Sequence, residues 1–428
     1  MMVAGRTAVT SPGFKAAVLT AGAMALSVQP SVMLAAGKAV FKLVSSCAIG
    51  YNFSKRGVLD QAALTSLSRL IFYIFQPCLL FVNVASALAM PGQKYSTLFV
   101  LPVVACLQII AGSLVAIGLA KALGIEGKSS EGRELRMCSS FANSGPLPLL
   151  FADSLFGSHA DPTLLPTAVA YISFYLLGWS PMFWTAGYGM LAGTPPPLPA
   201  LASGDPWAET GLRQLTLAQT AVVAAQKLRA SPTFKRIISP PVLGCIAGAA
   251  VGMCPPVYAL LIGPRAIFSP VFESLKALGA AYLPAAILVL AGSLARPGSK
   301  VAAGPPGSVG GGGSVLPKVE NSNPFAQLAF LKRVGAIMVS RFVFMPLVVA
   351  AILLTGSRVG AVPYDRMLWF VLLMEGCMPS AQNSVVILQM EKKPDLASSM
   401  ARTLTVVYLL SAVPIAMLLS GILQFVQL

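Results

Sequence analysis

The chain has 428 residues, of which 56% are hydrophobic and only 10% are charged, and its mean hydropathy is +0.77. A soluble globular domain carries about 25% charged residues, so the composition excludes an ordinary soluble protein and indicates a polytopic membrane protein. Lys and Arg number 30 against 14 Asp and Glu, a net charge of +16, which we attribute to cytoplasmic loops rather than to nucleic-acid binding.

Residues 1–31 contain Arg6 and Lys15 but no acidic residue, a composition that suits a targeting segment, a disordered tail or part of an extra hydrophobic helix. After them, ten apolar stretches reach the roughly 20 residues that a helix needs to cross a membrane. They cover residues 32–53, 66–88, 97–120, 135–157, 164–190, 238–262, 270–295, 329–355, 367–390 and 399–426. We therefore predict an all-α polytopic membrane protein with ten transmembrane helices.

Two long polar connections interrupt this series. The loop 191–237 opens with GTPPPLP and includes an Ala/Gln/Leu-rich part that can form a short surface helix. The loop 296–325 includes GPPGSVGGGGSV, a composition that cannot bury a core and predicts a flexible linker. The predicted organisation is a first five-helix repeat over 32–190, a cytoplasmic loop, and a second five-helix repeat over 238–428.

Basic residues alternate between successive loops. With the N-terminus outside, the first, third, fifth, seventh and ninth loops carry 20 Lys and Arg residues in or beside them, and the loops on the other side carry 4. Because cytoplasmic loops are enriched in Lys and Arg, this asymmetry supports both the number of spans and their orientation.

The ten spans divide into two sets of five in which prolines occupy matching positions. The second spans contain Pro77 and Pro284, and the third spans contain Pro102 and Pro346. Because each set has an odd number of spans, two such repeats have opposite orientations in the membrane. Paired interruptions at matching positions of inverted repeats indicate a transporter binding site.

The fourth and ninth spans contain the strongest interruptions, FANSGPLPLLF at 141–151 and CMPSAQNS at 377–384. Irregular backbone at membrane depth survives only where protein or a water-filled cavity satisfies it. Two crossing breaks would place half-helix N-termini, with their partial positive charge, near the middle of the membrane, where they favour an anion. We therefore expect the substrate-binding residues to be Asn143, Ser144, Gln382 and Asn383, and the crossing prolines to be Pro146, Pro148 and Pro379.

Ionisable residues inside apolar spans are costly and are functional candidates by default. The chain has four of them, Asp153, Lys276, Arg341 and Glu375. Asp153 is close enough to the end of its span to reach water, and Lys276 can pair with Glu273, three residues before it. Arg341 can snorkel or fix helix packing. Glu375 lies one turn before Pro379, where it either accepts a proton during transport or stays neutral and hydrogen-bonded.

Other kinds of site lack the residues that they need. The seven cysteines include no CxxC pair, and the one histidine, His159, lies in a polar turn, which argues against a His-based metal site or a Ser-His-Asp triad. Only Asp153 among the aspartates lies in a span, so a two-aspartate intramembrane protease is excluded. No Walker or Rossmann phosphate-binding motif occurs. We expect no enzymatic activity, no metal and no cofactor.

Five segments resemble, in the same order, helices of the auxin efflux carrier superfamily, and the fourth-span segment resembles its PIN-LIKES branch in particular. They correspond to the second, fourth, sixth, seventh and ninth helices of that family and read SLSRLIFYIFQPCLLFVNVASAL, FANSGPLPLLF, SPPVLGCIAGAAVGMCPPVYALL, YLPAAILVLAGSLARPG and FVLLMEGCMPSAQNSVVILQM. The resemblance runs from about residue 32 to the C-terminus, except in the two long loops.

The resemblance implies a five-plus-five inverted repeat related to the bile-acid transporter and sodium/proton antiporter folds, with a scaffold domain, a transport domain and broken helices four and nine that cross. It also implies that auxins such as indole-3-acetic acid are carried as anions, and that the protein resides in the endoplasmic reticulum; the plasma membrane and the plastid envelope are the alternatives. Asn143 and Pro148 match the helix-four motif, and Pro379 and Asn383 match helix nine. The chain departs from the family at Pro146, which replaces a second Asn, and at Glu375, where the family usually has an uncharged residue.

The function predicted from these features is secondary transport of a small organic anion, auxin or a similar carboxylate, by alternating access at the crossing, which would regulate intracellular auxin distribution. The alternatives are a symporter of another organic anion coupled to protons or sodium, of the bile-acid transporter type, and a transporter-like sensor. We expect the anion and membrane lipid as partners, with a homodimer left open, and no nucleic acid. The aromatic stretch YISFYLLGWSPMFWTAGYGM of the fifth span is a candidate wall for an indole ring.

Overall fold

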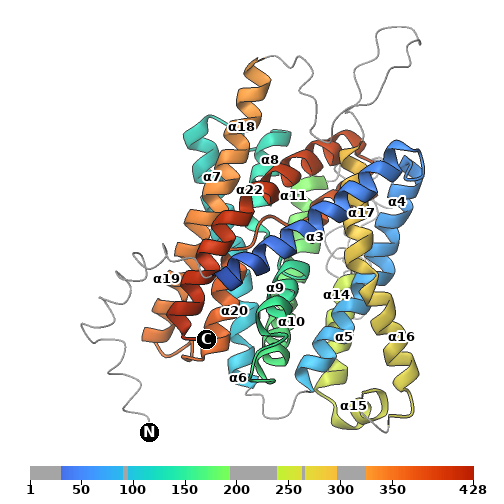
Figure 1. The fold of residues 1–428 in the computed structure, drawn as a ribbon, viewed down its shortest axis with the longest axis vertical. Coiled ribbons are helices and arrows are strands. Elements are labelled where there is room, and N and C mark those ends of the chain that lie inside the picture. Colours follow the sequence, from blue (N-terminus) through green and yellow to red (C-terminus); the bar gives the residue numbers. More distant parts are fainter. Residues whose placement is uncertain (1–29, 90–94, 193–238, 263–265, 296–323) are drawn as a thin grey trace, which may run out of the picture.

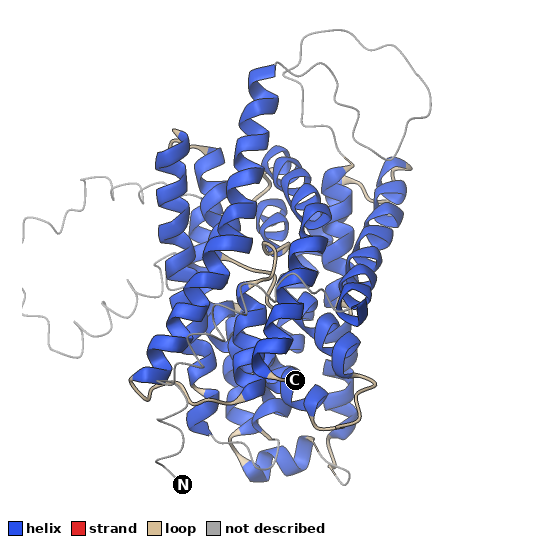
Figure 2. Ribbon diagram, turned by 60° about the vertical axis from the view of Figure 1, so that its left-hand side comes forward, coloured by secondary structure: helices blue, strands red, loops and turns tan. Residues whose placement is uncertain are grey.

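Apart from one isolated β-bridge, all regular structure in the described part of the computed structural model is helical (Figures 1 and 2). The structure describes residues 30–89, 95–192, 239–262, 266–295 and 324–428. The N-terminal segment 1–31, the loop 191–237 and the linker 296–325 fall almost entirely outside these ranges, so what the sequence suggests about them stays a prediction.

Helices occupy the first five predicted spans, and the fourth of these spans contains two separate helices. In chain order they are α3 (Pro30–Lys55), α4 (Gln61–Leu70), η1 (Ile71–Phe75), α5 (Gln76–Leu88), α6 (Tyr95–Leu98), α7 (Val100–Leu123), α8 (Ser130–Ser140), α9 (Pro146–Phe156), α10 (Leu164–Met182), η2 (Phe183–Gly187) and α11 (Tyr188–Ala192). The segments labelled η are π-helical turns, which continue the α-helices on either side of them.

The second five predicted spans are also helical, and the ninth is divided like the fourth. In chain order they contain α14 (Pro240–Gly252), α15 (Pro255–Leu261), α16 (Ser269–Ala280), α17 (Tyr282–Leu294), α18 (Pro324–Val339), η3 (Ser340–Phe344), α19 (Met345–Arg358), α20 (Arg366–Gly376), α21 (Asn383–Met390) and α22 (Pro394–Val426). The largest differences from the predicted boundaries are at α4, α8, α18 and α22, each of which begins five residues earlier than expected.

Five helical stretches in the described part of the chain are long and apolar enough to cross a membrane, and there are six if α14 and α15, which meet at 104°, form one bent span. The five are Gln61–Leu88, Val100–Leu123, Ser269–Leu294, Gln327–Arg358 and Pro394–Val426. The all-α membrane class is therefore confirmed, whereas the number of ten spans stays a prediction.

Two of the long helices contain a π-helical turn just before a proline. The turn η1 precedes Pro77, and η3 precedes Pro346. A proline ring crowds the carbonyl four residues earlier and removes a backbone donor, and a wider π turn accommodates both effects. These prolines therefore widen their helices locally. One of the two π turns, η3, contains the buried Arg341.

Helix α14 lies directly against α5 because glycines line its contact face. A Cβ atom on Gly244 would come within 2.5 Å of the carbonyl oxygen of Pro77, and one on Gly248 within 2.6 Å of that of Phe81. Small residues at positions i and i+4 let two helix backbones approach closely, which is how many helices associate in lipid. This contact fixes the position of α5, whose first residue is Gln76.

The helices pack in two groups (Figure 1). One, the α5–α14 group, consists of α4, α5, α14, α16 and α17. The other, the crossing group, consists of α7 to α11 and α18 to α22 and contains both divided helices. Helix α3 packs against α17 of the first group and against α9 and α22 of the second. The two groups meet beside the breaks in α8/α9 and α20/α21.

Candidate functional site

The two breaks pair with each other through their backbones. Asn143 N donates to the carbonyl oxygen of Pro379 at 2.7 Å, and Ala381 N donates to that of Phe141 at 2.9 Å. Between these bonds lies the isolated antiparallel bridge of Ala142 with Ser380. Figure 2 shows loop segments meeting in the middle of the bundle. Lipid offers no hydrogen-bond partners for free backbone N–H and C=O groups. Each break therefore provides some of the hydrogen-bond partners that the backbone of the other break needs.

The prolines of the fourth span begin a helix rather than damage one. Pro146 is the first residue of α9 and Pro148 the third. The first four N–H groups of a helix have no partner within it, so a proline at these positions loses nothing. Pro379 lies in the other break, between α20 and α21, and its carbonyl accepts the bond from Asn143.

Each predicted asparagine is held by a buried tyrosine from another helix. Asn143 Nδ2 donates to Tyr408 Oη at 2.6 Å, and Tyr408 Oη donates to the carbonyl oxygen of Ser380 at 2.9 Å. Tyr282 Oη donates to Asn383 Oδ1 at 2.5 Å. Tyr408 lies on α22 and Tyr282 on α17, so both asparagines have fixed orientations beside the crossing.

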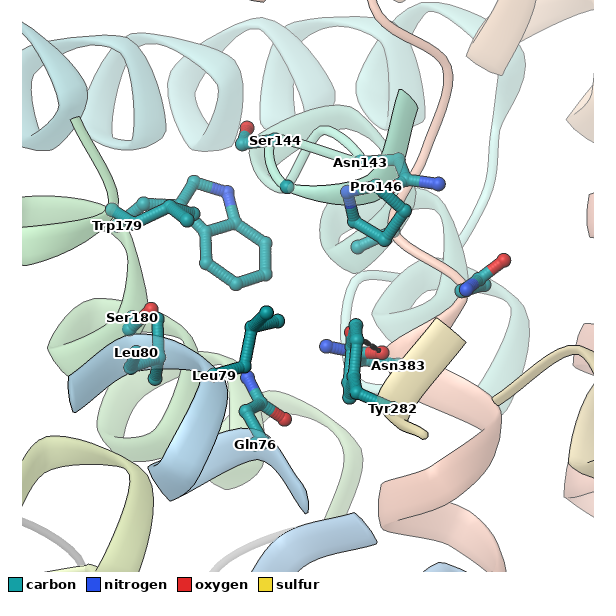
Figure 3. Close-up of a pocket in the computed structure, with 14 residues that line it drawn as sticks. Gln76, Leu79, Leu80, Asn143, Ser144, Pro146, Trp179, Ser180, Tyr282 and Asn383 are labelled. Carbon is teal, nitrogen blue, oxygen red and sulfur yellow. Dashed lines mark hydrogen bonds between the residues drawn. The ribbon is translucent and has the colours of Figure 1, made fainter. Parts of the chain in front are cut away.

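A pocket lies where the two helix groups meet at this crossing (Figure 3). The pocket is narrow, since the space in it that can hold the centre of a water molecule is about 20 Å³. The structure brings five of the eight predicted site residues to its wall: Asn143, Ser144, Pro146, Gln382 and Asn383. Pro148, Pro379 and Glu375 do not line it. A second cavity, equally narrow at about 20 Å³, shares Asn143, Pro146 and Gln382 with the first.

Several polar atoms on the pocket wall have no hydrogen-bond partner among the described residues. They include both amide atoms of Gln382, Oε1 of Gln76 and Nε1 of Trp179. These three side chains are at most 4% exposed. Since buried polar groups are almost always hydrogen-bonded, several unpartnered groups around one cavity indicate that water or a ligand completes them.

The charge environment of the pocket suits an anion. The lining residues, all of them described, include no Asp, Glu, Lys or Arg. The first residues of α9 and α21 lie at the wall, and the N-terminus of a helix carries a partial positive charge. Pro146 and Pro148 have no N–H group, and the N–H groups of Ser384 and Val385 are bonded to nearby carbonyls, so the donors at the wall are side-chain groups. The pocket therefore offers fixed dipoles and neutral side-chain donors in place of a charged side chain.

Trp179 is the aromatic residue of the fifth span that lines the pocket. Its ring stacks on Phe183 with centroids 4.7 Å apart and an interplanar angle of 12°, and it meets the ring of Phe141 edge-on at 6.0 Å. Figure 3 shows Trp179 and Tyr282 on different sides of the cavity, with Leu79 between them. The other lining residues add apolar surface, so the pocket joins a flat aromatic wall to a polar end.

The four ionisable residues inside the predicted spans have different surroundings. Asp153 is exposed, and Lys276 forms an exposed pair with Glu273 at 3.5 Å, as expected. Arg341 does not snorkel, because its side chain is buried. Glu375 is also fully buried. Its polar neighbours are Ser144 and Arg341, but neither makes a hydrogen bond of ordinary geometry to its carboxylate.

A polar cluster joins the two helix groups at the end of the bundle that carries Lys55 and Lys393. Gln389 on α21 donates to Ser293 Oγ on α17 at 2.8 Å. Gln61 on α4 donates to Gln389 Oε1 at 2.6 Å. Because Gln389 belongs to the crossing group and both partners to the other group, these bonds close the space between the groups at this end.

The sequence did not single out three side chains of this region, Gln76, Tyr282 and Tyr408, and it pointed to the aromatic stretch of the fifth span without distinguishing Trp179 in it. A signal was present for Gln76, since an amide inside an apolar span is costly unless it is hydrogen-bonded. Tyr282 and Tyr408 had no such signal, because a tyrosine in an apolar helix is ordinary. Only the packing of α17 and α22 beside the breaks shows that their hydroxyls reach the asparagines.

Two interrupted helices that cross beside a pocket, within an apolar helical bundle, define a membrane transport protein. The comparison with known families agrees: residues 35–419 match the model described as membrane transport protein, and the chain belongs to this family.

Curated relatives place the chain beside the PIN-LIKES proteins of Arabidopsis thaliana. It is 22% identical to Protein PIN-LIKES 7 over 358 residues, which cover 78% of this chain and 83% of that protein. It is 22% identical to Protein PIN-LIKES 5 over 346 residues, 75% of this chain and 80% of that protein. It is 20% identical to Protein PIN-LIKES 3 over 391 residues, which cover 84% of this chain and 90% of that protein. The resemblance to the auxin efflux carrier superfamily and its PIN-LIKES branch is thereby confirmed, as is the expectation that the protein is a transporter and not an enzyme.

Proposed function

We propose that the chain is a secondary transporter of a small organic anion, auxin or a similar carboxylate, which it moves by alternating access at the crossing of α8/α9 with α20/α21. The observation that carries this proposal is the set of unpartnered polar groups of Gln382, Gln76 and Trp179 around one pocket. They lie beside the first residues of α9 and α21, and half-helix N-termini hold anionic substrate groups in other carriers with broken helices.

The proposal includes ten membrane-spanning segments in two inverted sets of five. Each predicted span contains at least one described helix, and the divided pairs α8/α9 and α20/α21 are the fourth members of their sets. Five spans in each set give the sets opposite orientations, so the breaks would approach the crossing from opposite sides of the membrane.

Alternating access in this protein would be a movement of the crossing group against the α5–α14 group. The pocket has walls from both groups, since Gln76 and Tyr282 belong to one and Asn143 and Gln382 to the other. Its narrow space has to widen to admit a ring. On the side of Lys55, release of the bonds between Gln389 and its two partners would open the path.

The lining of the pocket favours a small aromatic carboxylate. The space that can hold the centre of a water molecule is only about 20 Å³, far below the roughly 300–1,000 Å³ of small-molecule pockets, so the two helix groups have to move apart before a substrate enters. In our proposal, Trp179 stacks on the ring of the substrate. The side-chain amides of Gln382 and Asn383 then receive the carboxylate, beside the partial positive charge at the start of α21.

We also propose the endoplasmic reticulum as the membrane, on the strength of the resemblance to the PIN-LIKES branch. A fluorescently tagged full-length chain should coincide with an endoplasmic reticulum marker. Labelling of the plasma membrane or the plastid envelope instead would refute this part of the proposal without affecting transport.

The decisive experiment is efflux of labelled indole-3-acetic acid from lipid vesicles that contain the purified full-length chain. We expect saturable efflux that a panel of aromatic and aliphatic carboxylates inhibits to different degrees. If no member of the panel is transported or competes, the organic-anion proposal is wrong.

The Asn383→Ala variant tests the site assignment in the same vesicles. A hydrogen bond to a charged group contributes about 1.5–3 kcal/mol, so KM should rise at least about tenfold while expression and reconstitution stay unchanged. The matched control is Tyr171→Phe on α10, because Tyr171 is buried outside the pocket and its hydroxyl makes no hydrogen bond to the described residues. An unaltered KM in Asn383→Ala would remove Asn383 from the site.

A further inference from the structure

The C-terminal ends of the two divided helices meet behind the pocket. Helix α8 ends at Ser140 and α20 at Gly376. The last carbonyls of a helix have no partner within it and carry a partial negative charge. The carbonyl of Ser139 lacks its usual helical partner for a specific reason, because Asn143 N bonds to Pro379 across the crossing instead.

A guanidinium group lies between the end of α8 and the break segment that follows α20. Arg341 Nε and one terminal nitrogen donate to the carbonyl oxygen of Met378, at 2.8 Å and 2.6 Å. The other terminal nitrogen donates to that of Ser139 at 3.2 Å. One positive charge therefore binds the last turn of α8 and, at the same time, the break segment two residues after the end of α20, from the π-helical turn η3 on a third helix.

The ligands of this guanidinium are carbonyl oxygens and not carboxylates. Arg341 is 1% exposed, and no carboxylate oxygen of the described residues lies within ion-pair distance of it, Glu375 included. The other buried arginine of the region, Arg333, differs in this respect, since it pairs with Glu131 at 3.2 Å and Glu134 at 3.5 Å. Backbone carbonyls at half-helix C-termini are the groups that coordinate coupling cations in carriers with broken helices.

We infer that Arg341 is a tethered cation that occupies an ion position built from the carbonyls of both broken helices. The covalently attached charge neutralises the two C-terminal ends permanently. It locks the crossing geometry, and transport then requires no sodium or other cation from solution to complete it. This inference concerns the crossing itself and holds whatever the transported anion is.

Removal of the side chain should uncover a cation-binding site, which thermal unfolding of the purified full-length protein can detect. We expect Arg341→Ala to unfold at a lower temperature than the unaltered protein, and to recover part of this loss, saturably, when guanidinium chloride is added at low concentration. The unfolding temperature of the unaltered protein should only fall when guanidinium chloride is added, because guanidinium is a denaturant. A rise in Arg341→Ala together with a fall in the unaltered protein would show that guanidinium fills a specific site in the variant, since a general effect of salt would change both proteins in the same direction.

Arg366→Ala is the matched control. Arg366 also donates to a carbonyl near a helix end, that of Gln427 at 3.2 Å, but it is exposed. Its loss should give no rise of unfolding temperature with guanidinium. Tetramethylammonium chloride is the second control, since this ion has the same charge but no N–H donor. Arg341→Lys should keep part of the stability, because lysine retains the charge without the planar fork.

Two results would overturn the inference. The first is that none of guanidinium, sodium and potassium raises the unfolding temperature of Arg341→Ala. If Arg341→Ala cannot be purified in folded form, the same measurement on Arg341→Gln takes its place. The other is efflux by the unaltered protein that stops when sodium and potassium are replaced by choline. The unfolding experiment needs no substrate, so a cation response without any carboxylate transport would refute the proposed function and leave this inference standing.

Discussion

Tyr408 links the two breaks through a single hydroxyl, so Tyr408→Phe is the sharpest test of the crossing. The substitution keeps the ring and removes two hydrogen bonds, one from Asn143 Nδ2 at 2.6 Å and one to the carbonyl oxygen of Ser380 at 2.9 Å. A buried polar group left without its partner costs about 1–3 kcal/mol. With two such groups, we expect Tyr408→Phe to lower the free energy of unfolding by about 2–6 kcal/mol.

The effect on transport should come through Asn143. Without Tyr408 Oη, its amide is free to rotate away from the orientation that the pocket requires, so kcat/KM for the carboxylate should fall. Thermal unfolding in detergent measures the first effect, and initial rates of efflux over a range of substrate concentrations measure the second. Tyr171→Phe again controls for the loss of a tyrosine hydroxyl away from the crossing.

A double-mutant cycle separates positioning from general damage. If Tyr408 acts by holding Asn143, the double variant Asn143→Ala/Tyr408→Phe should lose little more kcat/KM than Asn143→Ala alone. The expected coupling is about 1–2 kcal/mol, since contacting residues couple by about 0.5–3 kcal/mol. If the free-energy losses of the two single variants add up to that of the double variant within about 0.5 kcal/mol, the two residues act independently, and the reasoning is refuted.

Two further variants test other parts of the molecule. Glu375→Gln should flatten the pH dependence of transport if this buried carboxyl must be protonated for an anion to bind. The unaltered protein would then lose activity as pH rises and Glu375 ionises, whereas the glutamine stays neutral, and identical pH profiles would exclude a proton-carrying role. Gly248→Ala should destabilise the protein by about 1–3 kcal/mol in a thermal or chemical unfolding assay, because its Cβ meets the Phe81 carbonyl at 2.6 Å. Gly118→Ala, with open space around its Cβ, should be neutral or slightly stabilising, and equal losses in the two variants would contradict the packing argument.

The positions of the breaks could be predicted from the sequence, because they rest on backbone chemistry that residue types report directly. Pro146 and Pro148 remove N–H groups, so a helix has to begin there or be interrupted. Asn143 and Gln382 are too polar for lipid, so a cavity beside them was the reasonable expectation. The structure places both of them at the wall of one pocket.

The partners of these residues could not be predicted, because they depend on how distant helices pack. Tyr408 is 265 positions from Asn143, and Tyr282 is 101 from Asn383. Nothing in the local sequence distinguishes them from tyrosines in contact with lipid. Arg341 was recognised as costly, but its role needed the positions of the two carbonyls that it binds. The role of Glu375 in coupling stays a prediction.

The backbone pairing of the breaks also imposes an order on biosynthesis. Asn143 and Pro379 are 236 positions apart, and at about 5–20 residues per second the ribosome needs on the order of 10–50 s to travel between them. During that interval, the interruption after Ser140 has no partner strand. The nascent chain must therefore shelter this segment in water, in the insertion machinery or against a chaperone. A ribosome stalled before residue 378 would leave the segment accessible to a protease, and completion of the ninth helix would then protect it.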